Sequence, residues 1–271
     1  MPEPTRHFDR LAAKVAIVTG AGADGDEIGI GRAIAFLLAR EGALVMCADI
    51  DGERAARTAR EIEAHGGSAR SFAGDVSRPE DCQALVRESI ACFGRIDLLV
   101  NNVGISTPVR LDVVELDQWN HILAVNLSSA MLMCKFAVPE MARGGGGSIV
   151  NISSLAGMRA MGALAYGPSK AALAQFSREL GVQYGRQGIR VNTVAPGHVL
   201  TPHAMAKIPA AMREARRKVS PLGIEGDAWD VAQAVVFLAS DEARFVNGVQ
   251  LAVDGGVEAL APLAGYALIN D

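Results

Sequence analysis

Apolar, strand-like segments alternate with helical patterns along almost the whole chain. The strand-like segments lie at 15–19, 44–48, 69–73, 97–100, 148–152, 189–194 and 249–253. Helical patterns occupy 32–41, 52–65, 79–93, 117–142, 165–186 and 227–239. Neighbouring parallel strands need a crossover connection, usually a helix, so this alternation predicts a parallel sheet with both faces covered. We expect one α/β domain with a doubly wound parallel sheet of about seven strands and helices on both faces.

The composition favours one globular domain over a membrane or nucleic-acid-binding protein. The chain has 271 residues, is 50% hydrophobic and carries a net charge of −4. It contains no block of basic residues, which argues against nucleic acid as a partner. No run approaches the roughly 18 apolar residues of a membrane span, and residues 1–10 are polar and too short for a signal peptide. We expect a single domain over residues 1–271 with no nucleic-acid or membrane partner.

Cysteine and histidine usage predicts neither disulfides nor a metal site. The four cysteines occur singly on predicted strands or helices, without Cys-x-x-Cys spacing. We therefore expect reduced thiols, which are typical of a cytoplasmic protein. The five histidines include no pair at the spacing of metal ligands on a helix, so we expect no metal site.

The N-terminal segments predict a binding site for a dinucleotide. Residues 14–20 read as a buried strand that runs into a glycine turn, and a glycine-rich connection continues to Gly31, where a helical pattern begins. A strand, a glycine loop and a helix N-terminus together bind a pyrophosphate through free N–H groups and the helix dipole. Asp49 ends the second strand, 18 residues beyond Gly31, where a carboxylate would meet a ribose hydroxyl.

Tyr166 and Lys170 are four residues apart, a spacing that puts both side chains on one face of a helix. A nearby cation lowers a tyrosine pKa, but bringing it from about 10 to about 7 takes roughly 4 kcal/mol. An exposed ion pair supplies only about 0–1 kcal/mol. The pair would need a desolvated site and a second positive charge, such as an oxidised nicotinamide ring. Taken alone, the pattern also fits an aromatic at the core edge beside a solvated lysine. Pro168 within the motif predicts a helix that starts very near Tyr166.

Further motifs occur in the order typical of a known family. They are Thr19-Gly20 through Gly29-Ile30-Gly31, Asn101-Asn102-Val103-Gly104, Asn126, Ser153-Ser154, Tyr166 with Lys170, Pro196-Gly197 and Asp254-Gly255-Gly256. With them the chain resembles the classical short-chain dehydrogenase/reductase family over about residues 12–257. The resemblance implies a Rossmann-type fold, a nicotinamide coenzyme and a homotetramer. Its interfaces would lie on the two long helices, of which 117–142 carries Ile122, Leu123, Leu127, Ala130, Met131 and Cys134 at near-helical spacing.

The resemblance implies four catalytic residues. Tyr166 would exchange the proton of the alcohol, and Lys170 would lower the tyrosine pKa and bind the nicotinamide ribose. Ser154 would hold the substrate oxygen, and Asn126 would anchor a water that links Lys170 to solvent. Each of the last two has a structural alternative, because Ser154 could cap the strand end and Asn126 could satisfy buried backbone within its helix.

The coenzyme contacts implied by the resemblance involve glycine, acidic and small apolar positions at strand ends. The predicted coenzyme-binding residues are Gly20, Asp24, Gly29, Ile30, Asp49, Ile50, Asp75, Val76, Asn102, Gly104, Tyr166, Lys170, Pro196, Gly197, Val199 and Thr201. Asp49 predicts NAD, since it would repel the 2′-phosphate of NADP. The next residues, 50–53, include no arginine or lysine to offset that repulsion.

The sequence departs from the family pattern at two places. The glycine loop is about five residues longer, and its residues 21–28 carry three carboxylates, which we expect to point away from the pyrophosphate. The catalytic serine is the second. Alignment on the preceding strand selects Ser154, whereas the usual distance to the tyrosine selects Ser153. We favour Ser154, because the strand fixes the serine and the following loop can shorten.

The substrate is not identified by these motifs. The resemblance implies a core at 12–257, a substrate lid at 201–222 and a C-terminal extension at 258–271. Pocket candidates, by position only, are Ser106, Met158, Arg159, Met161, His198 and His203.

Three functions fit the motifs to different degrees. We favour an NAD-dependent oxidoreductase that interconverts a secondary alcohol and a ketone on a small molecule. A 3-oxoacyl-thioester (acyl-carrier-protein) reductase is the alternative, although it usually implies NADPH and a basic surface. A non-catalytic dinucleotide-binding sensor is a further alternative, but such a protein would be expected to lose Tyr166 or Lys170.

Overall fold

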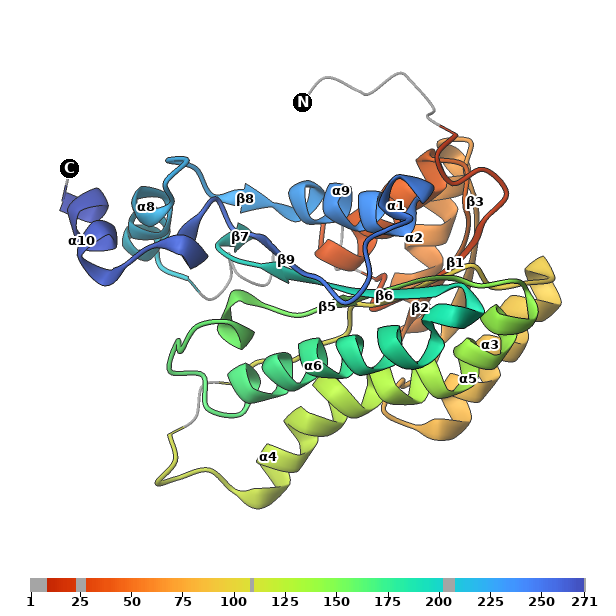
Figure 1. The fold of residues 1–271 in the computed structure, drawn as a ribbon, viewed down its shortest axis with the longest axis horizontal. Coiled ribbons are helices and arrows are strands. Elements are labelled where there is room, and N and C mark those ends of the chain that lie inside the picture. The colour runs from red at the N-terminus through yellow and green to blue at the C-terminus, as the bar shows by residue number, and fades with distance from the viewer. Residues whose placement is uncertain (1–8, 23–27, 108–109, 202–207, 271) are drawn as a thin grey trace.

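Seven parallel strands form the central sheet of the computed structural model, which describes residues 9–22, 28–107, 110–201 and 208–270 (Figure 1). Their order is β3-β2-β1-β4-β5-β6-β9. The strands are β1 (Val15–Thr19), β2 (Leu44–Asp49), β3 (Ser68–Ala73), β4 (Leu98–Asn101), β5 (Gly147–Ile152), β6 (Ile189–Pro196) and β9 (Gln250–Val253). The predicted parallel sheet is confirmed, because every adjacent pair is parallel.

Helices cover both faces of the sheet (Figure 1). One face carries α1 (Ile30–Arg40), α2 (Gly52–Ala64) and α9 (Ala228–Ala239). The other face carries α3 (Pro79–Phe93), α5 (Ser129–Arg143) and α6 (Tyr166–Tyr184). The predicted doubly wound α/β fold is therefore confirmed, and α6 begins at Tyr166, as Pro168 in its first turn predicts.

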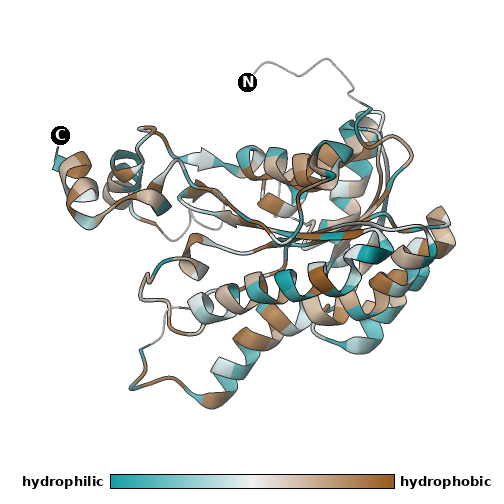
Figure 2. Cartoon of the chain, viewed as in Figure 1, coloured by the Kyte–Doolittle hydropathy of each residue, from teal (hydrophilic) through white to brown (hydrophobic). Residues whose placement is uncertain are grey.

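The five inner strands, β2, β1, β4, β5 and β6, are buried on both sides, which explains their continuous apolar runs. Successive residues of β1 point to opposite faces, so Val18 enters a first core with α1 and α9, whereas Ile17 enters a second core with α3 and α5. The surrounding helices carry both hydrophobic and hydrophilic residues (Figure 2), as expected of elements with one buried side.

The observed elements differ from the predicted ranges in three places. The helix expected at 117–142 is α4 (Leu116–Leu123), a π-helical turn at Ala124–Ser128 and α5 in succession. A short second sheet pairs β7 (Val199–Leu200) with β8 (Gly226–Asp227), although their sequences show no strand-like run. Two further helices, α8 (Ala210–Val219) and α10 (Pro262–Asn270), pack against each other beside the sheet.

The continuous helix Leu116–Arg143 is, by length and composition alone, apolar enough to cross a membrane, with a mean hydropathy of 1.6. The core helix of a globular protein can be equally long and apolar, so this is weak evidence for a membrane span. Of the 18-residue apolar stretch in this helix, 44% is buried inside the molecule. Met133, Ala137 and Met141 of this helix belong to the second core. Its apolar character is thus accounted for in part by packing under the sheet.

Candidate active site

A cleft of about 650 Å³ opens at the carboxyl ends of the strands, where β1 and β4 lie side by side. The chain winds outward from β1 in one direction and from β4 in the other, and such a reversal of strand order is where open α/β sheets bind ligands. We call it the central cleft. Its lining includes the predicted site residues Gly20, Gly29, Ile30, Asn102, Gly104, Ser154, Tyr166, Lys170, Pro196, Gly197, Val199 and Thr201.

Glycines bring the backbone close together at the first turn of the cleft. Gly20 has a φ of +64°, and a Cβ at Gly31 would overlap the carbonyl oxygen of Gly20. Asn102 holds this turn in place, because its amide nitrogen donates to the carbonyl oxygens of Thr19 (3.2 Å) and Gly20 (3.0 Å). The N-terminus of α1 follows at Ile30, so its free N–H groups face the turn. This arrangement suits a pyrophosphate.

Asp49 is tied to the glycine-rich connection at the end of β2. Its Oδ2 accepts from the Gly22 N–H at 2.9 Å and its Oδ1 from the Asp51 N–H at 3.1 Å. Asp51 in turn caps α2 by accepting from the N–H groups of Glu53 and Arg54. A Cβ at Gly22 would lie 2.6 Å from the Arg54 Cβ and 2.8 Å from Asp49 Oδ2. The carboxylate is therefore fixed beside the expected ribose position.

Arg54 lines the central cleft at this same end, and the sequence analysis did not identify it. Arg54 follows directly after residues 50–53, which contain no arginine or lysine. The N-cap carboxylate of Asp51 places Arg54 in the first turn of α2, and its Nε lies 3.4 Å from Asp51 Oδ2. The sequence does contain a signal for Arg54, because the helix-capping Asp51 follows the end of β2 and Arg54 comes three residues later. A cationic side chain therefore lies close to Asp49, although residues 50–53 supply none.

Among the described residues, the predicted coenzyme contacts Asp49, Ile50, Asp75 and Val76 are not among those that line the cleft. Ile50 is 72% exposed just after β2. Asp75 accepts from the Ser77 N–H and hydroxyl, and Val76 is buried in the second core. Their segment adjoins Asp49, whose carbonyl accepts from Gly74 N–H at 3.0 Å. Asp24 lies outside the described residues. These contacts stay predictions.

Lys170 is buried one turn into α6 from Tyr166. Its Nζ donates to the Ile152 carbonyl at 2.9 Å, and a Cβ at Gly104 would lie 2.9 Å from Nζ. Burial lowers the pKa of Lys170 to about 8. Gly104, which has no side chain, therefore leaves space for the Lys170 ammonium next to the cleft.

Tyr166 does not receive the pKa lowering from Lys170 that the sequence analysis expected. Burial raises the pKa of Tyr166, and a hydrogen bond with Ser154 opposes that rise. The Lys170 Nζ lies 5.8 Å from the centroid of the Tyr166 ring, so desolvation of the phenol outweighs the distant charge. The protein's own groups alone therefore keep Tyr166 a neutral phenol.

The two candidate serines face different partners. The Ser153 hydroxyl is buried and donates to the Lys170 carbonyl at 2.8 Å. Ser154 contacts Tyr166, and its Oγ accepts from the Ala156 N–H at 3.1 Å. Ser154 therefore has its hydroxyl beside the phenol, while Ser153 fastens β5 to α6.

Asn126 lies in the π-helical turn, buried and outside the lining of the central cleft. Its Oδ1 accepts from the Ile105 N–H at 2.8 Å, and its Nδ2 donates to the Ile105 carbonyl and the Ser169 hydroxyl. Both amide hydrogens are thereby used, so the amide nitrogen has none left for a water. The side chain instead joins the segment after β4 to α6, next to Lys170.

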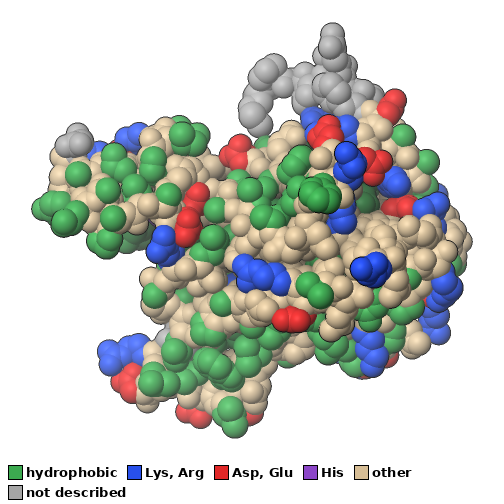
Figure 3. All heavy atoms as spheres, in the orientation of Figure 1, with side chains coloured by type: hydrophobic (Ala, Val, Ile, Leu, Met, Phe, Trp, Pro, Cys, Tyr) green, Lys and Arg blue, Asp and Glu red, His purple; other side chains and the backbone are tan. Residues whose placement is uncertain are grey.

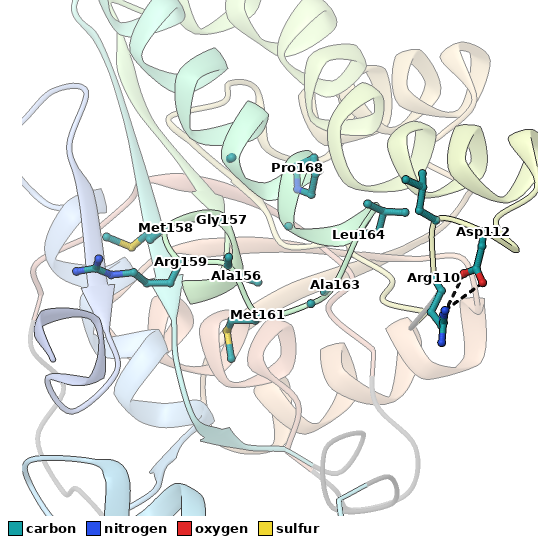
Figure 4. Close-up of a pocket in the computed structure, with 15 residues that line it drawn as sticks. Arg110, Asp112, Ala156, Gly157, Met158, Arg159, Met161, Ala163, Leu164 and Pro168 are labelled. Carbon is teal, nitrogen blue, oxygen red and sulfur yellow. Dashed lines mark hydrogen bonds and ion pairs between the residues drawn. The ribbon is translucent and has the colours of Figure 1, made fainter. Parts of the chain in front are cut away.

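A second hollow, which we call the outer hollow, has a volume of about 980 Å³ and lies beside residues 156–164 (Figure 4). None of the four predicted catalytic residues lines it. Of the pocket candidates, Met158, Arg159 and Met161 line the outer hollow, whereas Ser106 lines the central cleft. His198 is half-buried, and burial and the Arg216 charge lower its pKa. His203 is outside the described residues.

Comparison with known proteins gives consistent matches along nearly the whole chain. The family model described as Enoyl-(Acyl carrier protein) reductase matches residues 25–258. The 2,5-dichloro-2,5-cyclohexadiene-1,4-diol dehydrogenase of Sphingobium indicum is 37% identical, over 92% of this chain and 97% of its own. The D-threitol dehydrogenase of Mycolicibacterium smegmatis is 39% identical, over 92% and 95%. A solved structure of 7α-hydroxysteroid dehydrogenase, complexed with NADH and 7-oxo glycochenodeoxycholic acid, has a TM-score of 0.85 and 34% identity, over 92% and 96%.

Proposed function

The chain belongs to the short-chain dehydrogenase/reductase family of oxidoreductases, and from this premise we propose that it interconverts a secondary alcohol and a ketone on a small molecule with NAD. The observation that carries the proposal is the grouping of Ser154, Tyr166 and Lys170 along one cleft, with the serine in contact with the phenol. Such a group can hold an oxygen atom and exchange its proton.

The central cleft fits a nicotinamide dinucleotide. The close approach of Gly20 and Gly31 leaves backbone N–H groups accessible to a pyrophosphate, as a side chain there would not. Asp49 stands at the ribose end, and Lys170 lies next to Gly104 at the reacting end. When bound, the coenzyme accepts or gives the hydride. Its positive nicotinamide ring would also supply the second charge that the Tyr166 pKa needs.

The protein groups would then perform the proton transfer. Tyr166 would take the proton of the alcohol at its phenol oxygen, or give it to the ketone. Ser154 would donate to the same substrate oxygen as charge develops on it. Lys170, held by the Ile152 carbonyl, would bind the nicotinamide ribose and stabilise the phenolate. Asn126 would support this arrangement by fixing Ile105 and Ser169 rather than through a water on its amide nitrogen.

The test is a screen of purified protein with NAD, followed at the absorbance of the reduced nicotinamide. The panel contains cyclohexanol, D-threitol, a cyclic diol and a 7α-hydroxysteroid, because relatives named for such alcohols match this chain. Oxidation of at least one, lost in Tyr166→Phe, is expected. Binding of NAD without turnover of any alcohol or ketone would favour the non-catalytic sensor.

The 3-oxoacyl-thioester reductase remains the second candidate. The description of the matching family model and a 35% identical 3-oxoacyl-[acyl-carrier-protein] reductase of Thermotoga maritima support it. Asp49 and the net charge of −4 oppose it, because NADPH and an acidic carrier protein both favour basic surfaces. Acetoacetyl-CoA with NADPH discriminates the two, since turnover well above that of any alcohol with NAD would support the reductase.

The proposed assembly is a homotetramer in the cytoplasm. The apolar pattern of 117–142 supports it less than expected, because Ile122, Ala130 and Cys134 are buried within the subunit. Met131 keeps 40% of its surface exposed and stays available for an interface. Light scattering at micromolar concentration tests this, and a stable monomer would contradict the tetramer.

A further inference from the structure

A side chain from the turn after Ser154 reaches the C-terminal segment. The Arg159 guanidinium donates to the Glu258 carbonyl from Nε (3.0 Å) and Nη2 (2.6 Å), and Nη2 lies 3.1 Å from Glu258 Oε1. Figure 4 shows Arg159 pointing away from Arg110 and Asp112, which lie across the outer hollow. The contact joins residues 99 positions apart in the sequence.

The turn that carries Arg159 is rigid. The N–H groups of Gly157, Met158 and Arg159 all donate back to carbonyls of Ser154 or Leu155 at 2.9 Å. A Cβ at Gly157 would lie 2.8 Å from the Lys170 backbone, so the turn packs directly on α6. Arg159 therefore projects from a platform that is fixed independently of the C-terminal segment.

The backbone of Glu258 is held from the other side by Asp254. The Asp254 carboxylate accepts from the N–H groups of Glu258 (2.6 Å) and Gly256 (2.9 Å) just after β9. Arg159 thus completes the anchorage of a segment that leads directly into α10.

The helix α10 in turn supports α8. Gly265 is buried in α10, where a Cβ would lie 3.4 Å from Val219 at the end of α8, and the Lys218 Nζ donates to the Ile269 carbonyl at 3.2 Å. On its other side α8 contacts the rim of the central cleft, because the Arg216 Nη2 donates to the carbonyl of Val199, a lining residue. Figure 3 shows the lobe of α8 and α10 separated from the lower part of the molecule by a deep indentation.

We propose that Arg159 is a positioning residue that holds the C-terminal segment, and through α10 the helix α8, at the substrate side of the cleft. This inference rests on the proposed function and on the substrate lid that the family resemblance implies at 201–222, the range that contains α8. Removal of Arg159 leaves the turn at Ser154 with its own backbone bonds, so the chemical step should be retained. The substrate affinity should fall, because α8 loses part of its support.

The size of the effect follows from the exposure of the contact. Arg159 keeps 56% of its side chain exposed, so the charge attraction to Glu258 contributes little. The two donations to a carbonyl contribute more, and they survive in Glu258→Gln. We therefore expect Arg159→Ala to raise KM about three- to tenfold, and Glu258→Gln less than about twofold.

The first measurement is hydrogen exchange of the full-length protein, which requires no substrate. Arg159→Ala should exchange at least about threefold faster in 210–219 and 262–270, with α1 unchanged as internal reference. Arg110→Ala is the matched control, since Arg110 borders the same hollow but pairs locally with Asp112. Unchanged exchange in both helices of Arg159→Ala, or an equal increase in the control, would overturn the proposal. If Arg159→Ala does not fold, Arg159→Lys replaces it, with a smaller increase in the same helices.

The second measurement uses NAD with cyclohexanol as the probe. A raised KM with kcat within about twofold supports a positioning role, whereas an equal loss of kcat at unchanged KM would contradict it. The two proposals fail separately. If wild-type protein oxidises no alcohol, the proposed function fails and hydrogen exchange still decides the role of Arg159. If the wild type oxidises an alcohol but hydrogen exchange is unchanged in Arg159→Ala, only the proposed role of Arg159 is contradicted.

Discussion

The catalytic end of the central cleft and the lobe of α8 and α10 differ in how they are held in place. At the catalytic end, Lys170, Ser153 and Asn126 are almost fully buried and bond to main-chain atoms. In α8 no residue is fully buried, and the side chains of Arg213 and Arg216 pair with Glu225 outside the helix. Proton transfer needs groups fixed to within about 0.5 Å, which the buried end supplies. The lobe, with few buried contacts, is expected to open more easily.

Tyr166→Phe should have the largest effect, because it removes the proposed proton-transferring group from the buried catalytic end. The phenyl ring keeps the packing, and only the titrating oxygen is lost. Turnover should fall by about 10²–10⁴-fold, while the dissociation constant of NAD changes by less than about twofold. Steady-state kinetics and a fluorescence titration with NAD measure the two effects. Retention of more than about a tenth of the activity would remove Tyr166 from the proton transfer.

Lys170→Met tests whether burial at the catalytic end is unfavourable for stability. Burial lowers the pKa of Lys170 from 10.5 to about 8, so between these pH values the unfolded chain binds more protons. The penalty is fully present below about pH 8 and disappears as pH rises towards 10.5. At pH 7 the variant should be more stable by about 1–2 kcal/mol, after the loss of the bond to Ile152. It should also be inactive.

Urea unfolding of both proteins at pH 7 and pH 10 measures this difference. The advantage of Lys170→Met should shrink or reverse at pH 10. Arg110→Ala, an exposed substitution, serves as the control and should show no such trend. A variant that is less stable than wild type at both pH values would mean that the fold accommodates the charged lysine without penalty.

The wild-type protein should prefer NAD over NADP by at least about tenfold in kcat/KM. One like-charge contact at 4 Å and an effective dielectric of 20 costs about 4 kcal/mol, and a third of that gives tenfold discrimination. Asp49→Ala should narrow the preference for NAD over NADP in kcat/KM. Arg54→Ala should widen it, because Arg54 lines the same end of the cleft. Equal turnover of the wild type with both coenzymes would show that Arg54 offsets the repulsion from Asp49, and faster turnover with NADP that it outweighs it.

Glu225→Gln should change the substrate KM and leave kcat unchanged. Glu225 lies 3.3 Å from Arg216 and 3.6 Å from Arg213, so it links α8 to the segment before β8. Loss of its charge leaves the mostly buried Arg216 without this carboxylate and should raise the substrate KM at least about threefold, with kcat unchanged. Glu214→Gln is the control, because Glu214 pairs with Arg217 within α8 itself. A tenfold loss of kcat in Glu225→Gln would mean that the lobe is as tightly coupled to catalysis as the core.

The sheet, its helices and most of the central cleft could be predicted from the sequence alone. Local patterns carry that information, because the two-residue period of a strand, the glycine turn after β1 and the Tyr166–Lys170 spacing each depend on near neighbours. The same patterns predicted that α6 begins at Tyr166.

Contacts between distant segments could not be predicted from the sequence, because they form only when the folded chain brings those segments together. The use of the Asn126 amide by Ile105, the approach of Arg54 to the cleft and the bond from Arg159 to Glu258 join segments with no shared local pattern. The pKa of Tyr166 belongs to the same group, because it depends on how deeply the folded chain buries the phenol. Burial and long-range pairing are properties of the packed molecule, and a pattern of neighbouring residues does not contain them.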